Sequence, residues 1–187
     1  MKSACFTGHR VFTGDTTNLE TRLYDILERA IIKENVTDFY AGGAVGWDEL
    51  AARTVLKLRE VYPQIKLHLI LPCSNEEQTV KWTEEQKIEF YRILKLAYSV
   101  EYTSEHYYNG CMKVRNARLV ELADFCFCFW DTNRQKSGTA QTVRMAQRKK
   151  IMIINFFRAC SVSFYVRIFE RNFVDYKEKI RRHTDVW

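Results

Sequence analysis

Glycine and proline are scarce in this sequence, which has seven glycines and two prolines in 187 residues. Linkers and disordered chains are rich in such residues and poor in apolar ones, whereas apolar residues make up 47% of this chain. No internal repeat is visible. A chain of this length buries about two thirds of its unfolded surface, so we expect a compact globule that needs no disulfide or metal to hold it together.

Long apolar runs are missing as well. No stretch reaches the roughly 18 residues that a membrane helix requires, and residues 1–30 lack the basic and then apolar segments of a secretory signal. The cysteines lack the paired two-residue spacing of a zinc site, and the histidines show no metal-binding pattern. We therefore expect a soluble, cytoplasmic protein with buried, reduced thiols and with no membrane association, cofactor or metal.

Six short apolar runs, rich in β-branched or aromatic residues, are typical of buried strands. They cover residues 3–8, 36–43, 65–73, 97–102, 124–131 and 150–157. Segments with helical spacing lie between most of them, at residues 19–31, 50–58, 84–97, 111–123 and 139–148. The alternation predicts an α/β fold over residues 1–157, a three-layer, doubly wound, Rossmann-like domain with a mainly parallel sheet. In such sheets ligands bind beyond the carboxyl ends of the strands.

Residues 158–187 have a different pattern. Apolar residues recur every three or four positions from Val162 to Ile180, which favours an amphipathic helical extension, although residues 161–169 also suit a strand. The aromatic stripe of this segment fits a packing surface better than a ligand site. We expect it to pack on the domain or on a partner subunit, with a homodimer favoured.

The loop after the first expected strand reads "TGHR" and begins at Thr7. Gly8 allows a sharp turn whose backbone amides can cradle an anion. His9 and Arg10 add donors, and a guanidinium is a planar fork suited to phosphate or carboxylate. A surface loop whose arginine pairs with an acid explains this motif equally well when it is taken alone.

The second loop, "YAGGAVGWDELAA" at residues 40–52, contains Gly42, Gly43 and Gly46 between a strand and a helix. This arrangement lets a phosphate approach backbone amides and the positive end of a helix, although it matches neither GxGxxG nor the lysine-bearing P-loop. Asp48 lies in the first helical turn. It either caps the helix or accepts from a ribose hydroxyl or holds a hydrated cation.

The third and fourth loops follow later strands. Residues 71–82 contain Ser, Asn, Gln and Trp side chains that suit a base or sugar pocket, and a plain loop is the alternative. Ser137, Gly138 and Thr139 precede an expected helix, where they present amides and hydroxyls to an anion. A simple helix cap explains the same three residues.

The motifs "TGHR", "GGAVGWD", "LPC", "RNARLVELAD" and "WD…SGTAQTV" occur in this order over about residues 3–155. In that order they resemble the SLOG superfamily of Rossmann-like proteins, and within it the small YpsA/YoqJ-like branch. The superfamily includes the "lonely guy" phosphoribohydrolases, which release a base from a nucleoside monophosphate, the DNA-processing protein DprA, which binds single strands, and sensor domains of antiviral defence. The resemblance implies nucleotide or nucleotide-derived ligands without fixing a reaction.

The resemblance also implies site residues. Glycines, hydroxyls and one arginine of three loops look like the phosphate and sugar loops, namely Gly8, Arg10, Gly42, Gly43, Ser137, Gly138 and Thr139. Arg115 resembles the arginine that opens the corresponding helix in the hydrolases, and Asn116 beside it is expected to face the pocket. A surface helix charge is the alternative for Arg115.

One departure from the hydrolases concerns catalysis. Their glycine-rich segment ends in Gly-Thr-x-x-Glu, whereas residues 138–142 of this chain place Thr142 where the carboxylate should be. Glycosidic cleavage passes through an oxocarbenium-like state that a carboxylate stabilises and a threonine does not. Either Asp48 or Asp131 has taken the role, or the protein binds without cleaving.

Three functions follow from these patterns. The preferred hypothesis is a domain that binds a nucleotide or a nucleotide-derived small molecule as a sensor or a sequestering protein, which leaves open whether it is an enzyme. The alternative is a nucleotide N-glycosidase with Asp48, Asp131 and Arg115 as catalytic candidates. The third is a binder of single-stranded nucleic acid, suggested by the basic run at residues 144–150 and the basic tail. The net charge of +6 suits an anionic ligand but is too small to indicate nucleic acid by itself.

Overall fold

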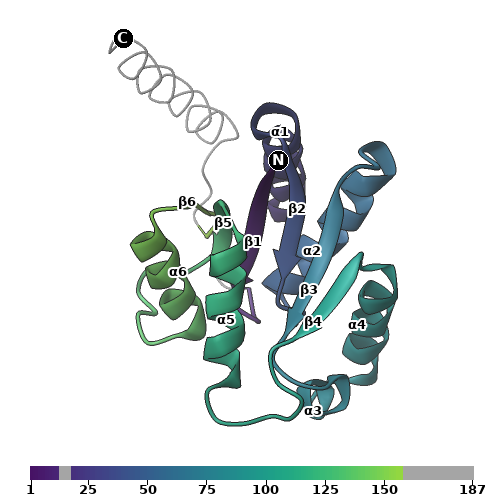
Figure 1. The fold of residues 1–187 in the computed structure, drawn as a ribbon, viewed down its shortest axis with the longest axis vertical. Coiled ribbons are helices and arrows are strands. Elements are labelled where there is room, and N and C mark those ends of the chain that lie inside the picture. The colour runs from purple at the N-terminus through teal and green to yellow at the C-terminus, as the bar shows by residue number, and fades with distance from the viewer. Residues whose placement is uncertain (13–17, 158–187) are drawn as a thin grey trace, which may run out of the picture.

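The structure is a computed structural model in which residues 1–12 and 18–157 are described. Six strands form one fully parallel sheet in the order β4-β3-β2-β1-β5-β6 (Figure 1). They are β1 (Lys2–Gly8), β2 (Val36–Ala41), β3 (Lys66–Leu71), β4 (Ser99–Tyr102), β5 (Phe125–Phe129) and β6 (Met152–Asn155). The predicted α/β fold is confirmed.

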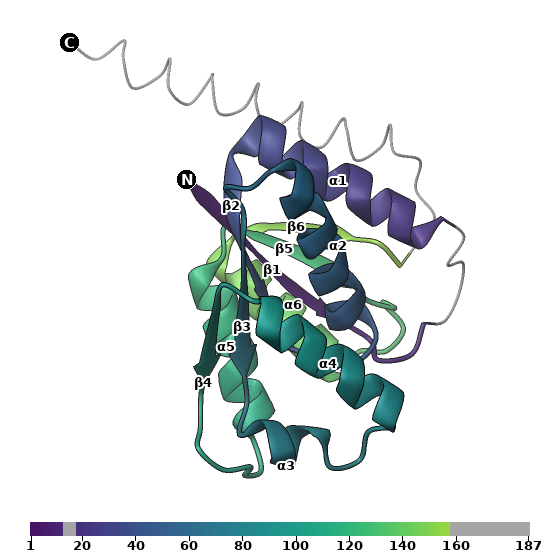
Figure 2. The same ribbon diagram turned by 90° about the vertical axis from the view of Figure 1, so that its right-hand side faces the viewer.

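The helices cover both faces of the sheet. They are α1 (Leu19–Glu34), α2 (Trp47–Val61), α3 (Asn75–Thr79), α4 (Glu84–Leu96), α5 (Cys111–Leu122) and α6 (Gly138–Lys149). Figure 2 shows α1, α2 and α4 on one side of the sheet and α5 and α6 on the other. Right-handed crossovers require this change of side, because the chain moves outward from β1 to β4 and then returns to place β5 on the other flank of β1. The strand order therefore reverses between β1 and β5.

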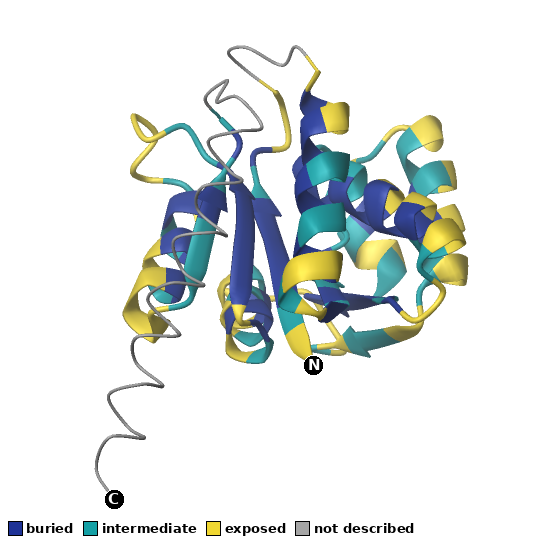
Figure 3. Cartoon of the chain, turned by 90° about the horizontal axis from the view of Figure 1, so that it is seen from above, coloured by how far each residue is buried: buried dark blue, intermediate teal, exposed yellow. Residues whose placement is uncertain are grey.

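Two apolar clusters fill the spaces between the sheet and its helices, and Figure 3 shows the central strands buried and the outer sides of the helices exposed. The larger cluster lies beneath α1, α2 and α4 and holds Trp47, whose indole N–H donates to the Phe127 carbonyl at 3.1 Å. The smaller cluster lies beneath α5 and α6. The five cysteines of the described residues are buried and free, as predicted, namely Cys5, Cys73, Cys111, Cys126 and Cys128, and Cys160 lies outside the described residues.

Residues 71–82 differ from the expected loop. They contain the short helix α3, which starts at the N-cap Ser74, and Trp82 packs edge-on against Phe90 with a ring separation of 5.4 Å. Trp82 is thereby part of the margin of the larger cluster. None of residues 71–82 lines the cleft described below, so the base-pocket interpretation of this segment gains no support from that cleft.

Beyond β6, Phe156 is buried in the larger cluster and Phe157 contacts the ring of Phe129 at 5.3 Å. The expected amphipathic extension at residues 158–187 lies outside the described residues. Among the described helices, none combines the length and the apolar character needed to cross a membrane.

Candidate functional site

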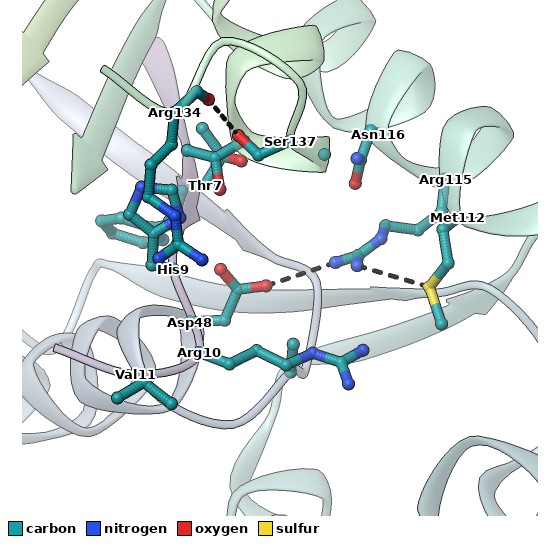
Figure 4. Close-up of a pocket in the computed structure, with 15 residues that line it drawn as sticks. Thr7, His9, Arg10, Val11, Asp48, Met112, Arg115, Asn116, Arg134 and Ser137 are labelled. Carbon is teal, nitrogen blue, oxygen red and sulfur yellow. Dashed lines mark hydrogen bonds and ion pairs between the residues drawn. The ribbon is translucent and has the colours of Figure 1, made fainter. Parts of the chain in front are cut away.

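A cleft of about 410 Å³ opens beside the carboxyl end of β1, near the point where the strand order reverses (Figure 4). This is where ligands bind in doubly wound sheets. Ten of the predicted site residues line the cleft, namely Thr7, Gly8, His9, Arg10, Asp48, Arg115, Asn116, Ser137, Gly138 and Thr139. Loops that are far apart in the sequence therefore meet around one cavity, while their roles in binding a ligand stay predictions.

Four predicted residues do not line this cleft, namely Gly42, Gly43, Gly46 and Asp131. Gly43 lies next to α3, where its carbonyl accepts from the side-chain amide of Gln78 at 2.8 Å. The carboxylate of Asp131 accepts from the backbone N–H of Asn133 at 3.0 Å and so stabilises its own loop. Neither contact faces the cleft lining, so both residues support neighbouring loops instead.

Two of the glycines have a clear steric role. A Cβ atom at Gly42 would lie 1.1 Å from a terminal guanidinium nitrogen of Arg115. Gly46 has a φ of 83°, and a Cβ there would lie 2.3 Å from the carbonyl oxygen of Arg10, a conformation and a contact that only glycine accommodates easily. The glycine-rich loop is therefore needed to fit the two arginines, whether or not it contacts phosphate.

Asp48 and Arg115 form a buried ion pair at the centre of the cleft wall. A terminal nitrogen of Arg115 lies 3.2 Å from Oδ2 of Asp48, and the two residues are 7% and 5% exposed. Burial raises the pKa of Asp48, while Arg115 and the backbone N–H groups of Ala44 and Gly42, which donate to the carboxylate, act in the opposite direction. The surface-charge alternative for Arg115 is wrong. The amides of Gly42 and Ala44 serve Asp48, so they are not free to hold a phosphate.

One N–H donor of Arg115 is unpaired. Its Nε atom is buried and has no hydrogen-bond partner among the described residues, and its other terminal nitrogen lies 3.8 Å from the sulfur of Met112. A buried, unpaired N–H group is costly unless a partner is supplied. Because Arg115 lines the cleft, an anionic or carbonyl group of a ligand is a suitable partner.

His9 is held as a neutral imidazole. Its Nε2 accepts from the backbone N–H of Asp131 at 3.1 Å, which places the proton of the neutral ring on Nδ1. Burial lowers the pKa of His9, and the positive charge of Arg134 lowers it further, against a smaller opposite effect of Asp131. Asp131 thus positions His9 through its backbone.

The N-terminus of α6 forms another wall of the cleft. The hydroxyl of Ser137 accepts from the backbone N–H of Ala140 at 3.1 Å and donates to the carbonyl of Arg134 at 3.0 Å. Ser137 is therefore the N-cap, which is the alternative that the sequence left open for these residues. Gly138 and Thr139 follow in the first turn of this 12-residue helix, where the helix dipole favours an anion.

Thr142 does not reach the cleft. Its side chain is fully buried, and its hydroxyl donates to the carbonyl of Gly138 one turn earlier, at 2.9 Å. The position at which the hydrolases carry a glutamate is thus closed to a ligand in this protein.

Sequence reasoning missed Arg134, which is exposed and lines the cleft on the loop before α6. The signal was its position, three residues before the N-cap Ser137, where a basic side chain reaches the same anion site. Met112 was missed as well. It lies one turn before Arg115 on α5 and lines the cleft beside it.

A second polar network, on the sheet, was not predicted. Nε2 of His68 lies 2.9 Å from the carboxylate of Asp38, and Nδ1 lies 2.7 Å from the hydroxyl of Ser99. The imidazole is stacked on Tyr40 at 4.7 Å and meets the edge of Tyr98 at 5.4 Å. The network links β2, β3 and β4. Within the described part of the chain, no three His, Cys, Asp or Glu side chains converge as metal ligands.

Comparison with known families agrees with this geometry. Residues 11–158 match the family model YpsA, described as the YspA SLOG family. The chain belongs to the YpsA family of SLOG proteins. Among the relatives, YoqJ, an uncharacterized SPbeta prophage-derived protein of Bacillus subtilis, is 28% identical over an alignment of 142 residues that covers 70% of this chain and 81% of YoqJ. A UPF0398 protein of Bacillus velezensis is 30% identical over 134 residues, which are 71% of this chain and 70% of the relative.

A solved structure extends the comparison to the fold. DNA processing protein A (DprA) from Streptococcus pneumoniae superposes on this YpsA-family chain with a TM-score of 0.56 at 14% sequence identity. The superposition covers 82% of this chain and 50% of DprA, so the chain spans about half the length of that protein. The resemblance to the SLOG superfamily is confirmed, and at this identity the likeness to DprA concerns the fold alone.

Proposed function

We propose that this protein binds a nucleotide or a nucleotide-derived small molecule in the cleft, as a sensor or a sequestering domain. The observation that carries the proposal is the buried Arg115, which lines a cleft near the reversal of strand order and has an unpaired Nε. Arg10 and Arg134 add two more guanidinium groups, and the N-terminus of α6 adds backbone N–H groups. Together these donors suit a ligand with phosphate and hydroxyl groups.

Binding without cleavage is favoured by the acids of the cleft. Asp48 is the one acidic residue among the described lining residues, and Arg115 and two backbone N–H groups already occupy its carboxylate. Thr142 is buried inside α6. A glycosidase needs a carboxylate placed against the sugar, and Asp48 would have to give up its structural partners to serve.

A thermal-shift and native mass spectrometry screen of nucleotides, cyclic dinucleotides and ADP-ribose forms tests the proposal. We expect at least one compound to raise the melting temperature, and the shift to be lost in Arg115→Gln. Arg92→Gln is the matched control, because Arg92 is exposed on α4 and pairs only locally with Glu89. Absence of both a bound species and a shift across the whole panel would overturn the proposal.

The competing function is a nucleotide N-glycosidase. It draws on the same cleft, because burial raises the pKa of Asp48 and favours the protonated form that a general acid needs. Incubation with nucleoside monophosphates, followed by chromatography for free base, decides the question. Release of base by the unaltered protein would establish the enzyme, and release that persists in Asp48→Asn would remove Asp48 from the reaction.

A third function, binding of single-stranded nucleic acid, draws on the exposed residues Arg144 and Arg148 of α6. A gel-shift assay at low salt tests it, and no retardation of single-stranded DNA would eliminate it.

The main proposal includes a homodimer and a cytoplasmic location. The free cysteines of the described region are in keeping with a reducing compartment.

A further inference from the structure

The charges that line the cleft do not balance. Arg115 is neutralised by Asp48 at 3.2 Å, and the pKa of His9 is lowered by burial and by Arg134, which keeps the ring neutral near pH 7. Arg10 and Arg134 are exposed at the cleft, and no carboxylate among the described residues pairs with either of them. The cleft therefore holds two positive charges in excess.

The two excess charges belong to different parts of the wall. Arg134 precedes α6 and lines the cleft together with the first residues of that helix, so its guanidinium and the backbone N–H groups of the helix N-terminus are the first donor group. Arg10 follows β1 and lines the same cleft as Arg115, whose unpaired Nε supplies the second donor group. Figure 4 shows Arg134 on one side, the guanidinium groups of Arg10 and Arg115 on the other, and Asp48 between them.

A single phosphate group is compact and satisfies one such donor group at a time. Asp48 lies between the two groups (Figure 4), and its carboxylate already accepts from Arg115 and two backbone N–H groups, so it offers an anion no donor at the middle of the cleft and one phosphate does not serve both sides equally. A cleft of about 410 Å³ is large enough for a small organic ligand rather than an inorganic ion alone.

We infer that the ligand is a nucleotide with two phosphoryl groups, such as a nucleoside diphosphate or a pyrophosphate-bridged dinucleotide. One phosphoryl group is held by Arg134 and the N-terminus of α6, and the other by Arg10 and Nε of Arg115. The inference rests on the proposed function, because it specifies the ligand of the same cleft. It also assigns Arg134 a role in selecting diphosphates over monophosphates.

Isothermal titration of the full chain with paired probes tests the inference. The probes are the monophosphate and diphosphate of each of the four nucleosides, and the variants are Arg10→Gln and Arg134→Gln. Both arginines are exposed, so the variants are expected to fold, which circular dichroism checks. Arg92→Gln on α4 is the control for loss of an arginine outside the cleft.

We expect the diphosphate to bind the unaltered protein at least about tenfold more tightly than the monophosphate. Each of the two cleft variants is expected to weaken the diphosphate by about tenfold, since a charge-assisted hydrogen bond is lost in each. The monophosphate is expected to respond strongly to only one of them, because it occupies one donor group.

Equal affinity for the two members of every pair would overturn the inference, and so would equal weakening of both members in both variants. Either result would leave the proposed function intact, since nucleotides would still bind. If no nucleotide bound at all, the proposed function itself would fail and the inference with it.

Discussion

The role of Asp48 became clear only from its contacts in the structure. In the sequence it is a carboxylate in the first turn of a helix, with capping, ribose binding or cation binding as open roles. In the structure it is buried beneath Arg115 and accepts from two backbone N–H groups. Arg115 is 67 positions away in the chain, so no local pattern could reveal the pair. A buried charge of this kind holds the site together before any ligand is bound.

Replacing Asp48 by Asn tests this structural role. The variant keeps the shape of the side chain but leaves the Arg115 charge buried without a counter-charge, which costs about 3 kcal/mol. We expect the free energy of unfolding, measured with urea, to fall by about this amount.

Glu84→Gln removes an exposed ion pair with Lys87 and serves as the control, with little change in the free energy of unfolding expected. A change in Asp48→Asn no larger than that of the control would contradict the role.

Gly42→Ala tests the fit between the glycine-rich loop and Arg115. The added Cβ would lie 1.1 Å from the guanidinium, so Arg115 has to move and its pairing with Asp48 is disturbed. We expect a loss of about 1–3 kcal/mol in unfolding free energy together with weaker nucleotide binding. Gly138→Ala is the matched control, because nothing lies within 4 Å of a Cβ placed there. Its stability should stay within about 1 kcal/mol, and comparable losses in both variants would count against the steric role.

Whole elements were more predictable than single residues. All six strands were predicted within a few residues of their ends. The central strands are apolar because a parallel sheet is covered on both faces, whereas β4 at the edge of the sheet has no buried residue, contrary to the expectation of a buried strand. The helix predicted at residues 111–123 is α5 (Cys111–Leu122). Helix α3 was missed because five residues are too few for a periodic signal. Its N-cap Ser74 and the contact of Gln78 with Gly43 hold it in place.

The hydrogen-bond network of Asp38, His68 and Ser99, which links β2, β3 and β4, is expected to make the stability of the protein depend on pH. Burial raises the pKa of Asp38, but hydrogen bonds with Thr37 and His68 outweigh this effect and hold the pKa below its ordinary value of 3.8. A depressed carboxyl pKa contributes stability above the unfolded value, and the contribution is lost as the pH falls through the folded value.

Asp38→Asn is therefore expected to be less stable than the unaltered protein at pH 7, with a difference that shrinks as the pH is lowered below 3.8. Urea midpoints measured at a series of pH values report the difference. Glu60→Gln, at an exposed position of α2, is the control for loss of a carboxylate elsewhere. A deficit of Asp38→Asn that stayed constant down to pH 3 would contradict the assignment.

At the scale of the whole molecule, the alternation of strands and helices predicted where the site would form but not its shape. Ten of the predicted residues converge on one cleft because the carboxyl ends of parallel strands meet at one edge of the sheet. The sequence did not reveal that Asp48 lies between the donor groups, that Thr142 faces the interior or that Arg134 belongs to the site. Each of these depends on which side of a helix or loop faces the cleft, which is set by packing between distant elements.

The salt dependence of binding affinity distinguishes a nucleotide bound in the cleft from a nucleic acid bound on the surface. A nucleotide in the cleft meets the few guanidinium groups that line it, so its affinity should fall only gradually as salt is raised. A single strand that follows the face of α6 with Arg144 and Arg148 would displace several counterions. Its affinity would fall steeply, by about 0.7 per phosphate contacted in a plot of the logarithm of affinity against the logarithm of salt concentration.

We expect titrations between low and high salt to give a slope of about 2 or less in this plot for a nucleoside diphosphate. Arg144→Gln and Arg148→Gln, on the outer face of α6, should leave that slope unchanged. A slope several times larger that fell in these two variants would identify the face of α6, rather than the cleft, as the binding surface.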